Sequence, residues 1–238
     1  MTDFKEIWSY LSGEPLLWLT ATLAAYAIGD AAYRASGNRP WVNPVLVAVL
    51  LLSATLALTA TPYEAYFEGA QFVHFMLGPA TVALAAPLFA NLARVRRSAL
   101  AMAAALLAGS ATAIGSALAI ARALGVDGAS LLSLAPKSAT APVAMGISES
   151  LGGSPTLTAV MVIFTGITGA VIATPLLNAL RIRDWRARGF ATGTAAHGIG
   201  TARAFQVNET AGVFSGVAMG LNAILTAILA PLAVRLFF

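Results

Sequence analysis

The 238-residue sequence has no cysteine, two histidines and few charged side chains. Without cysteine the chain cannot form a disulfide, a thiolate nucleophile or a zinc–thiolate centre. Charged residues make up 10% of the chain, whereas a soluble domain carries about 25%. The shortage of charge therefore argues against a soluble globular protein.

Long apolar runs occupy most of the chain instead. Hydrophobic residues make up 58% of it, and runs of helical length cover residues 16–33, 45–60, 99–121, 156–180 and 213–238. A helix needs about 20 apolar residues to cross the hydrocarbon core. We therefore expect an all-α, polytopic membrane protein with about six full spans. Residues 1–14 are polar and mixed in charge, so we expect no signal peptide before the first span.

The sequence predicts a first broken helical segment at residues 63–92. A mildly polar helix at 63–75 is interrupted by Gly78-Pro79, and an apolar helix restarts at 80–92. Each arm has about 13 residues, or roughly 20 Å, which is too short to cross about 30 Å of hydrocarbon. The pattern predicts a re-entrant hairpin, with a broken crossing helix as the alternative.

The sequence predicts a second broken helical segment at residues 130–151. Proline clashes with the preceding helical turn, so Pro136 should stop a helix near Ala135, and Pro142 fits the first turn of a helix restarting around Thr140. The break gathers backbone amides, two hydroxyl groups and the cation of Lys137. Irregular backbone inside a membrane is tolerated only where it is buried or lines a cavity. We therefore expect an anion site there.

A weak internal repeat links the two broken segments. An offset of 57 residues aligns LGPATVALAAPLF at 77–89 with LAPKSATAPVAMG at 134–146, and Gly109 with Gly166. If each broken segment is re-entrant, each unit crosses the membrane once and the two copies are inverted, which is a transporter architecture. We expect one transmembrane domain over residues 1–238, with scaffold-like spans at 1–61, repeats at 62–122 and 123–181, and C-terminal spans at 182–238.

The basic residues fall mainly on one side of this topology. That side holds Lys5, Arg94, Arg96, Arg97, Arg181, Arg183, Arg186 and Arg188, and the other holds only Arg34, Arg39 and Arg122. Cytoplasmic loops are enriched in lysine and arginine, so the N-terminus should be cytoplasmic. The net charge of +4 is therefore better explained by topology than by nucleic-acid binding.

The stretch RGFATGTAAHGIGTARAF at 188–205 combines glycines with one histidine. Gly189, Gly193, His197 and Gly200 are spaced by four, four and three residues, which places them on one face of an unbroken helix. Such a face permits close approach of a second helix. Arg203 would point elsewhere unless Gly198 or Gly200 breaks the helix.

Three motifs in order resemble one known family. They are PKSATAPVAMGISESLGGSPTLTAVMVIFTGITGAVIATPLL from residue 136, RGFATGTAAHGIGTARAF from residue 188 and GVFSGVAMGLNAILTAILAPL from residue 212. With LGPATVALAAPLF they resemble the LrgB/CidB family of antiholin-like membrane proteins. The likeness runs from residue 62 to the C-terminus, and residues 1–60 match only as generic spans.

The resemblance implies two functions. Family members are described as regulators of murein hydrolase export through a holin-like pore, together with a smaller partner of the LrgA/CidA type. Relatives in plant plastids carry glycolate and glycerate, and bacterial relatives are linked to pyruvate. The resemblance therefore implies a secondary transporter of small monocarboxylates (the glycolate, glycerate, lactate and pyruvate class) in the cell inner membrane, with a holin-like pore that regulates lysis as the alternative. A homodimer and an LrgA/CidA-type partner are expected, and no cofactor or metal.

The candidate substrate-binding residues are Lys137, Ser138, Thr140, Pro79, Thr81, His197, Thr201 and Arg203, and the candidates for proton coupling are His197 and Glu149. Each has a plainer structural explanation. The ammonium group of Lys137 could reach water from a hairpin tip, the hydroxyl groups could cap a helix, and His197 could pack against a neighbouring helix. Pro79 and Pro136 should shape the breaks. Glu149 could lie at the membrane interface. Arg203 could bind a carboxylate only if it faces a cavity.

Other functional classes fit the sequence less well. An enzyme is disfavoured because the histidine in the glycine-rich stretch has no nucleophile elbow or metal-ligand spacing near it. A pore requires a polar stripe along a span, and the long apolar runs show none. Polar groups concentrate at the breaks, which favours a carrier.

Overall fold

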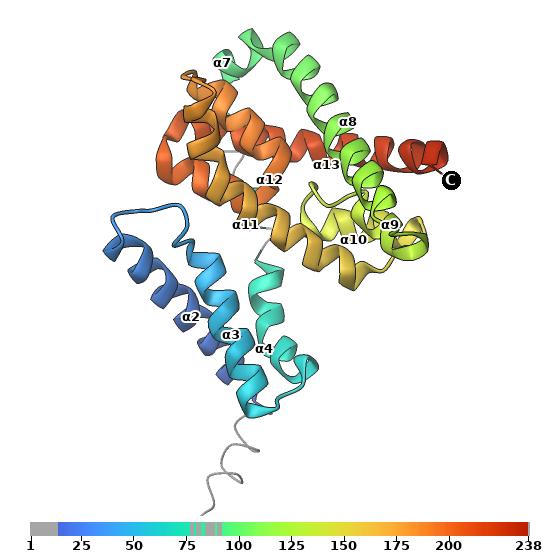
Figure 1. The fold of residues 1–238 in the computed structure, drawn as a ribbon. Coiled ribbons are helices and arrows are strands. Elements are labelled where there is room, and N and C mark those ends of the chain that lie inside the picture. Colours follow the sequence, from blue (N-terminus) through green and yellow to red (C-terminus); the bar gives the residue numbers. More distant parts are fainter. Residues whose placement is uncertain (1–13, 77–78, 80–81, 84–88, 90–91, 238) are drawn as a thin grey trace, which may run out of the picture. The chain divides into compact units, whose positions relative to one another are not determined.

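The computed structural model describes residues 14–76, 79, 82–83, 89 and 92–237, and these residues are helical apart from short connections, with no strand among them. The chain divides into two compact units, Met1–Ala85 and Ala86–Phe238. Four described helices are long and apolar enough to cross a membrane (Figure 1). The expected all-α, polytopic membrane class is therefore confirmed. The finer division of the chain at 61, 122 and 181 stays a prediction.

The first unit contains α2 (Pro15–Ala35), α3 (Pro44–Thr59) and α4 (Tyr63–Phe75). Glycine allows close packing at both interfaces of α2: Gly29 lies against the backbone of Pro44, and Gly69 lies against the backbone of Pro15. The rings of Trp18 and Tyr66 meet edge to face at 5.8 Å. The helix predicted at 63–75 has these bounds, whereas Gly78 and Thr81 lie outside the described residues.

The second unit contains seven helices in its described part. They are α7 (Leu92–Arg97), α8 (Ala99–Ala123), α9 (Gly128–Leu134), α10 (Ala141–Ser150), α11 (Pro155–Ala179), α12 (Trp185–Val207) and α13 (Glu209–Phe237). The candidate spans of this unit are α8, α11 and α13. The shorter helices α9 and α10 and the broken helix α12 connect these spans.

The break at Pro136 forms as the sequence predicts. Helix α9 ends at Leu134, and α10 begins at Ala141 with Thr140 as its N-cap and proline in its first turn. The chain then returns to α9, because the N–H of Ser154 donates to Ser133 Oγ at 2.7 Å and Thr158 Oγ1 donates to the Ser133 carbonyl at 3.0 Å. Residues 128–150 therefore form a hairpin between α8 and α11, which we call hairpin A.

Helix α12 is also a hairpin, which the sequence did not predict as such. Ala196 and His197 have non-helical backbone angles, with φ of +40° and ψ of −134° at His197. Arg188 and Arg203, with Trp185, Thr192 and Val207, line one small cavity. Fifteen residues of unbroken helix would separate the two arginines by about 22 Å. The two arms of α12 therefore fold back on each other at Ala196-His197, and we call 185–207 hairpin B.

Hairpin B packs against the first turns of α13 along both arms. Gly193 lies against the backbone of Ser215, and Gly189 lies against the backbone of Ala211. On the returning arm, Thr201 Oγ1 hydrogen-bonds Ser215 Oγ at 2.9 Å. The predicted single face holding Gly189, Gly193, His197 and Gly200 is therefore wrong beyond Gly193, because the break turns His197 toward α11 instead.

The two hairpins enter from opposite ends of α11. Hairpin A precedes α11 and hairpin B follows it, and α11 is a candidate span of 25 residues. The hairpins therefore have opposite orientations. The two aligned glycines of the repeat both lie against hairpin B. Gly109 of α8 lies against the side chain of Thr194, and Gly166 of α11 lies against the ring of His197. The expected pairing of hairpin A with Gly78-Pro79 stays a prediction, because Gly78 lies outside the described residues.

Candidate functional site

The tip of hairpin A (residues 135–140, tip A) and the tip of hairpin B (Ala196 and His197, tip B) meet beside α11. Ala139 of tip A packs in one cluster with Ala144 and Val162. The carbonyl of Val162 is hydrogen-bonded to His197 Nε2 at 2.9 Å. Ala139, Val162 and His197 are 1%, 1% and 4% exposed. The two breaks thus form one buried centre within the second unit.

Gly166 makes room for the imidazole of His197. A Cβ at Gly166 would lie 2.6 Å from His197 Cε1 and 2.9 Å from Nε2. The ring therefore rests directly on the backbone of α11, one turn beyond the carbonyl that it binds. The positive φ of His197 is a strained conformation for a residue with a side chain. The hydrogen bond to Val162 and the one from Thr201 Oγ1 to the His197 carbonyl, at 2.8 Å, hold this conformation.

Asn222 of α13 ties tip A to two spans. Its side-chain amide donates to the carbonyl of Ser138 at 3.0 Å and accepts from Ser110 Oγ of α8 at 2.5 Å. All three residues are at most 5% exposed. An irregular backbone inside a membrane must be satisfied by neighbouring groups, and Asn222 supplies one of them. It therefore fixes the position of tip A relative to α8 and α13.

Lys137 places a cation at this centre. Its Nζ lies 3.4 Å from Ser138 Oγ, and Lys137 stands two residues before Ala139, which packs against Val162. The side chain is partly buried. Both ion pairs found among the described residues, Asp30–Arg34 and Asp184–Arg186, lie elsewhere. Lys137 is therefore a cation at a buried hairpin tip with no carboxylate bonded to it in the described part of the chain.

Backbone groups add to this positive character. Helix α10 begins at the tip, and its N-cap Thr140 makes no side-chain hydrogen bond to it. The returning arm of hairpin B begins directly after His197. Helix starts carry unpaired N–H groups and the positive end of the helix dipole. The tips therefore combine two helix starts, one ammonium group and the hydroxyl groups of Ser138 and Thr140, which suits a small anion.

The structure brings together Lys137, Ser138, Thr140 and His197, but not the other predicted site residues. Thr201 is buried and holds the break of hairpin B. Arg203 lies with Arg188 in the small cavity between the arms, away from tip A. Glu149 is exposed near the C-terminal end of α10, about 13 Å along the helix axis from Thr140.

Pro79 and Thr81 are the two remaining candidates, and neither is assigned to this centre. Pro79 belongs to the first unit, and Thr81 lies outside the described residues. Their roles stay predictions. Among the described residues no group of three or more histidine, aspartate or glutamate side chains could hold a metal ion.

Sequence reasoning missed three partners in this centre. Ser110, Val162 and Gly166 act through a hydroxyl, a carbonyl and a missing side chain. In helices rich in alanine, glycine and valine such residues give no distinct signal. Asn222 was recognisable as the strongly polar residue of an apolar span, but its partners were not.

Comparison with known proteins then decides the family. Residues 22–236 match the LrgB-like family. The chain belongs to this family. The match begins 40 residues earlier than the motif resemblance, which started at residue 62, so the first spans belong to the family region as well. No solved structure matches this LrgB-like chain.

Several curated relatives cover nearly the whole chain. An uncharacterized Bacillus subtilis protein, YxaC, is 36% identical over 93% of this chain and 96% of its own length. A second, YwbG, is 40% identical over 81% of this chain and 86% of its own. The holin-like protein CidB of Staphylococcus aureus strain N315 is 29% identical over 94% of this chain and 98% of its own. The last name favours the holin-like alternative over the carrier.

Proposed function

We propose that this LrgB-like protein is a secondary carrier of small monocarboxylate anions, bound between the tips of hairpins A and B. The observation that carries the proposal is Lys137, a cation to which no described carboxylate is bonded, where two oppositely oriented hairpins meet. An ionisable group within a membrane is costly and is normally paired. A substrate carboxylate would supply the missing partner.

The chemistry of the tips suits a two- or three-carbon acid. Lys137 and the N–H groups at the start of α10 would bind the carboxylate. The hydroxyl groups of Ser138 and Thr140 would bind a hydroxyl or keto oxygen on the next carbon. Ala139, Ala144 and Val162 form an apolar wall. Glycolate, glycerate, lactate and pyruvate all have this pattern.

Opposed hairpins also suit alternating access. A carrier presents one site to each side in turn, and broken helices entering from opposite sides give two nearly equivalent routes to it. His197 is the candidate for carrying a coupled proton. A carboxylate that crosses with a proton moves no net charge, which avoids about 2.3 kcal/mol of electrical work per charge at 100 mV.

A holin-like pore is the second candidate, favoured by the name of the CidB relatives. Such a function would involve a homodimer or larger assembly and an LrgA/CidA-type partner. Against an open passage at the tips stands their burial, since Ser138, Ala139 and His197 are at most 5% exposed. A pore would therefore have to form elsewhere or require the tips to separate.

Uptake into proteoliposomes tests the proposal. Labelled glycolate, glycerate, lactate and pyruvate should enter saturably and compete with one another, with and without a pH gradient, while an encapsulated dye is retained. Lys137→Ala should abolish saturable uptake. Ser138→Ala should weaken it about tenfold or more, since a hydrogen bond to a charged group contributes about 1.5–3 kcal/mol. Arg235→Gln, at the far end of α13, is the matched control and should transport normally.

Two results would reject the carrier. Dye release without saturable acid uptake would indicate a pore. Unchanged transport by Lys137→Ala would reject the assigned site even if the protein is a carrier.

A further inference from the structure

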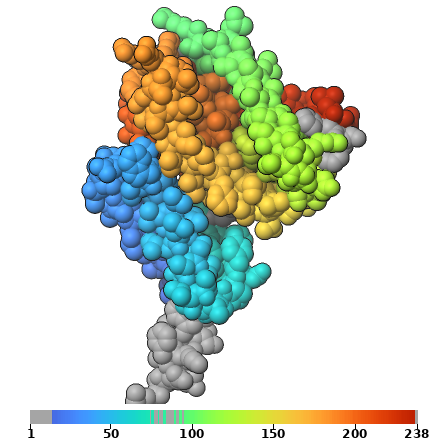
Figure 2. Space-filling model, in the orientation of Figure 1, coloured from blue at the N-terminus to red at the C-terminus, as the bar shows by residue number. Residues whose placement is uncertain are grey.

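A groove separate from the hairpin tips runs along the second unit. It has a volume of about 590 Å³ and lies between α8 and the first arm of hairpin B. Figure 2 shows the green surface of α8 and the orange surface of α12 on its two sides. Small side chains leave this space open: the walls include Ala101, Ala105, Gly109, Ala113, Ala187, Ala191 and Ala195.

The groove has the depth of one bilayer leaflet. Along α12 its lining runs from Arg186 to Ala195, which is nine residues or about 14 Å of helix. The hydrocarbon core of a bilayer is about 30 Å thick. Along α8 the lining runs from Ala101 to Ala113, about 18 Å of helix. From the arginine-rich end of the second unit the groove therefore reaches about half the thickness of a hydrocarbon core, or slightly more.

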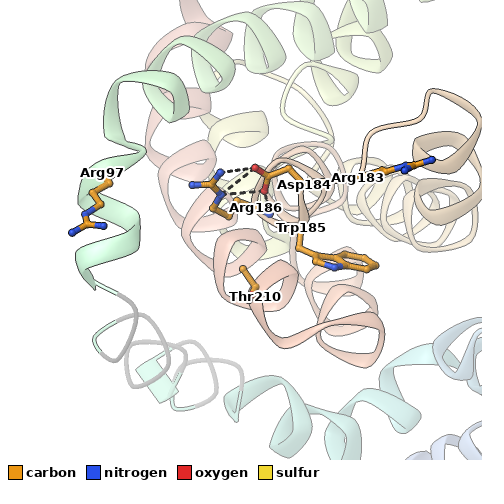
Figure 3. Close-up of a pocket in the computed structure, with 6 residues that line it drawn as sticks. All are labelled: Arg97, Arg183, Asp184, Trp185, Arg186 and Thr210. Carbon is orange, nitrogen blue, oxygen red and sulfur yellow. Dashed lines mark hydrogen bonds and ion pairs between the residues drawn. The ribbon is translucent and has the colours of Figure 1, made fainter.

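The mouth of the groove is cationic. A cavity of about 500 Å³ there is lined by Arg97, Arg183, Asp184, Trp185, Arg186 and Thr210 (Figure 3). The hydrogen bonds from Arg186 lower the pKa of Asp184 to about 2, and the two side chains form an ion pair at 2.6 Å. Asp184 therefore stays ionised, and the positive charge of Arg186 balances its negative charge. Neither Arg97 nor Arg183 has an ion pair within the described part of the chain.

We propose that the groove binds one acyl chain of an anionic phospholipid, whose phosphate is bound at the mouth by Arg97, with Arg183 adding positive charge there. Apolar walls with a cationic entrance match an amphiphile of that kind. Arginine forms paired hydrogen bonds with phosphate oxygens. Trp185 at the mouth is an aromatic residue of the type enriched at headgroup level. The inference does not depend on the carrier proposal, because it uses different residues.

Native mass spectrometry of the delipidated, full-length protein tests the lipid site. The protein is mixed with equal amounts of dioleoyl-phosphatidylglycerol and dioleoyl-phosphatidylcholine, and the retained lipid is identified. The wild type should retain one phosphatidylglycerol in clear preference. In the double variant Arg97→Gln/Arg183→Gln this preference should fall about tenfold or more, since each basic residue near an anionic surface contributes about 1 kcal/mol, or roughly fivefold.

A second variant tests the groove itself. Ala105→Leu/Ala191→Leu fills it without changing charge, and both side chains are exposed in the second unit. Retention of both lipids should be lost. The matched controls are Ala104→Leu/Ala108→Leu on exposed positions of α8 outside the groove, and Arg235→Gln, and both should behave as wild type.

Three results would overturn the proposal. The wild type could retain the two lipids equally, the arginine variant could keep its preference, or the leucine variant could retain as much phosphatidylglycerol as its control. The last result would mean that the retained lipid binds outside the groove. The arginine variant changes only exposed side chains, so it tests the charge requirement even if the leucine variant does not fold.

Discussion

Replacing Gly166 by alanine tests the contact that seats His197. The added Cβ would lie 2.6 Å from Cε1 and 2.9 Å from Nε2 of the imidazole, both too close for van der Waals contact. The ring must then leave the Val162 carbonyl, which it reaches at 2.9 Å. We therefore expect tip B to lose its anchor to α11.

The expected change in unfolding free energy combines one stabilising term and two destabilising terms. Alanine gains about 1 kcal/mol over glycine inside a helix. Overpacking costs about 1–3 kcal/mol, and a hydrogen bond within a membrane contributes about 0.6 kcal/mol on average. The net effect at Gly166 is a loss of about 0.5–2.5 kcal/mol of unfolding free energy.

Gly115→Ala is the matched control. Gly115 lies within the span α8, and a Cβ there would meet nothing within 4 Å. This variant should gain stability, so the two substitutions should have opposite signs. Unfolding in a detergent titration, followed by circular dichroism, measures both.

A double-mutant cycle identifies the cause. His197→Ala removes the ring that the new Cβ would strike, so Gly166→Ala should cost less in that background. Equal stability changes for Gly166→Ala and Gly115→Ala would refute the packing argument. A full penalty at Gly166 without the imidazole would assign the strain to Ile199 instead, whose Cδ1 would lie 2.9 Å from the added Cβ.

Three further predictions concern the tips and the mouth of the groove. Asn222→Ala should destabilise the protein by about 1–3 kcal/mol, since it removes two buried hydrogen bonds and leaves a cavity; additivity with Ser110→Ala in unfolding experiments would show that the two do not interact. His197→Gln should remove any dependence of uptake on pH between 5 and 8, the range in which histidine titrates; a retained pH profile would leave His197 a packing role only. The folded-state pKa of Asp184 is lowered to about 2 by Arg186, so the pair stabilises the fold above about pH 4 and this contribution fades as the pH falls toward 2; thermal unfolding of wild type and Asp184→Asn should therefore differ at neutral pH and converge in acid.

The break in hairpin A could be predicted from the sequence because proline acts through its own covalent structure. Pro136 and Pro142, only six residues apart, disfavour a continuous helix, and the structure ends α9 at Leu134 and restarts at Ala141. Single prolines, in contrast, stay inside α11 at Pro175 and inside α13 at Pro231. Four of the five apolar runs coincide with helices long and apolar enough to cross a bilayer, since that length is set by the bilayer thickness. The run at 45–60 forms the shorter helix α3, so the described residues hold four candidate spans where about six were expected.

The break in hairpin B could not be predicted in the same way. No proline lies near His197, and the glycines around it permit a helix as well as a turn. The positive φ falls on His197 itself, a position that tertiary contacts select through the Val162 carbonyl and the gap at Gly166. An unbroken helical wheel therefore gave the wrong face for His197 and Gly200. For the same reason Arg203 could be placed only conditionally.

The hydrogen bonds at the tips bear on the choice between a carrier and a static scaffold. Tip A is held to α13 by one bond from Asn222, and tip B is held to α11 by one bond from His197 and to α13 by one from Thr201. Bonds of this kind within a membrane contribute about 0.6 kcal/mol each on average, so the three together supply roughly 2 kcal/mol in addition to the close packing of hairpin B on α13. Two conformations separated by a few kcal/mol can both be populated, and a ligand that prefers one of them shifts the balance. A carboxylate bound to Lys137 at tip A and facing His197 at tip B would have that differential affinity, because it interacts with both hairpins at once.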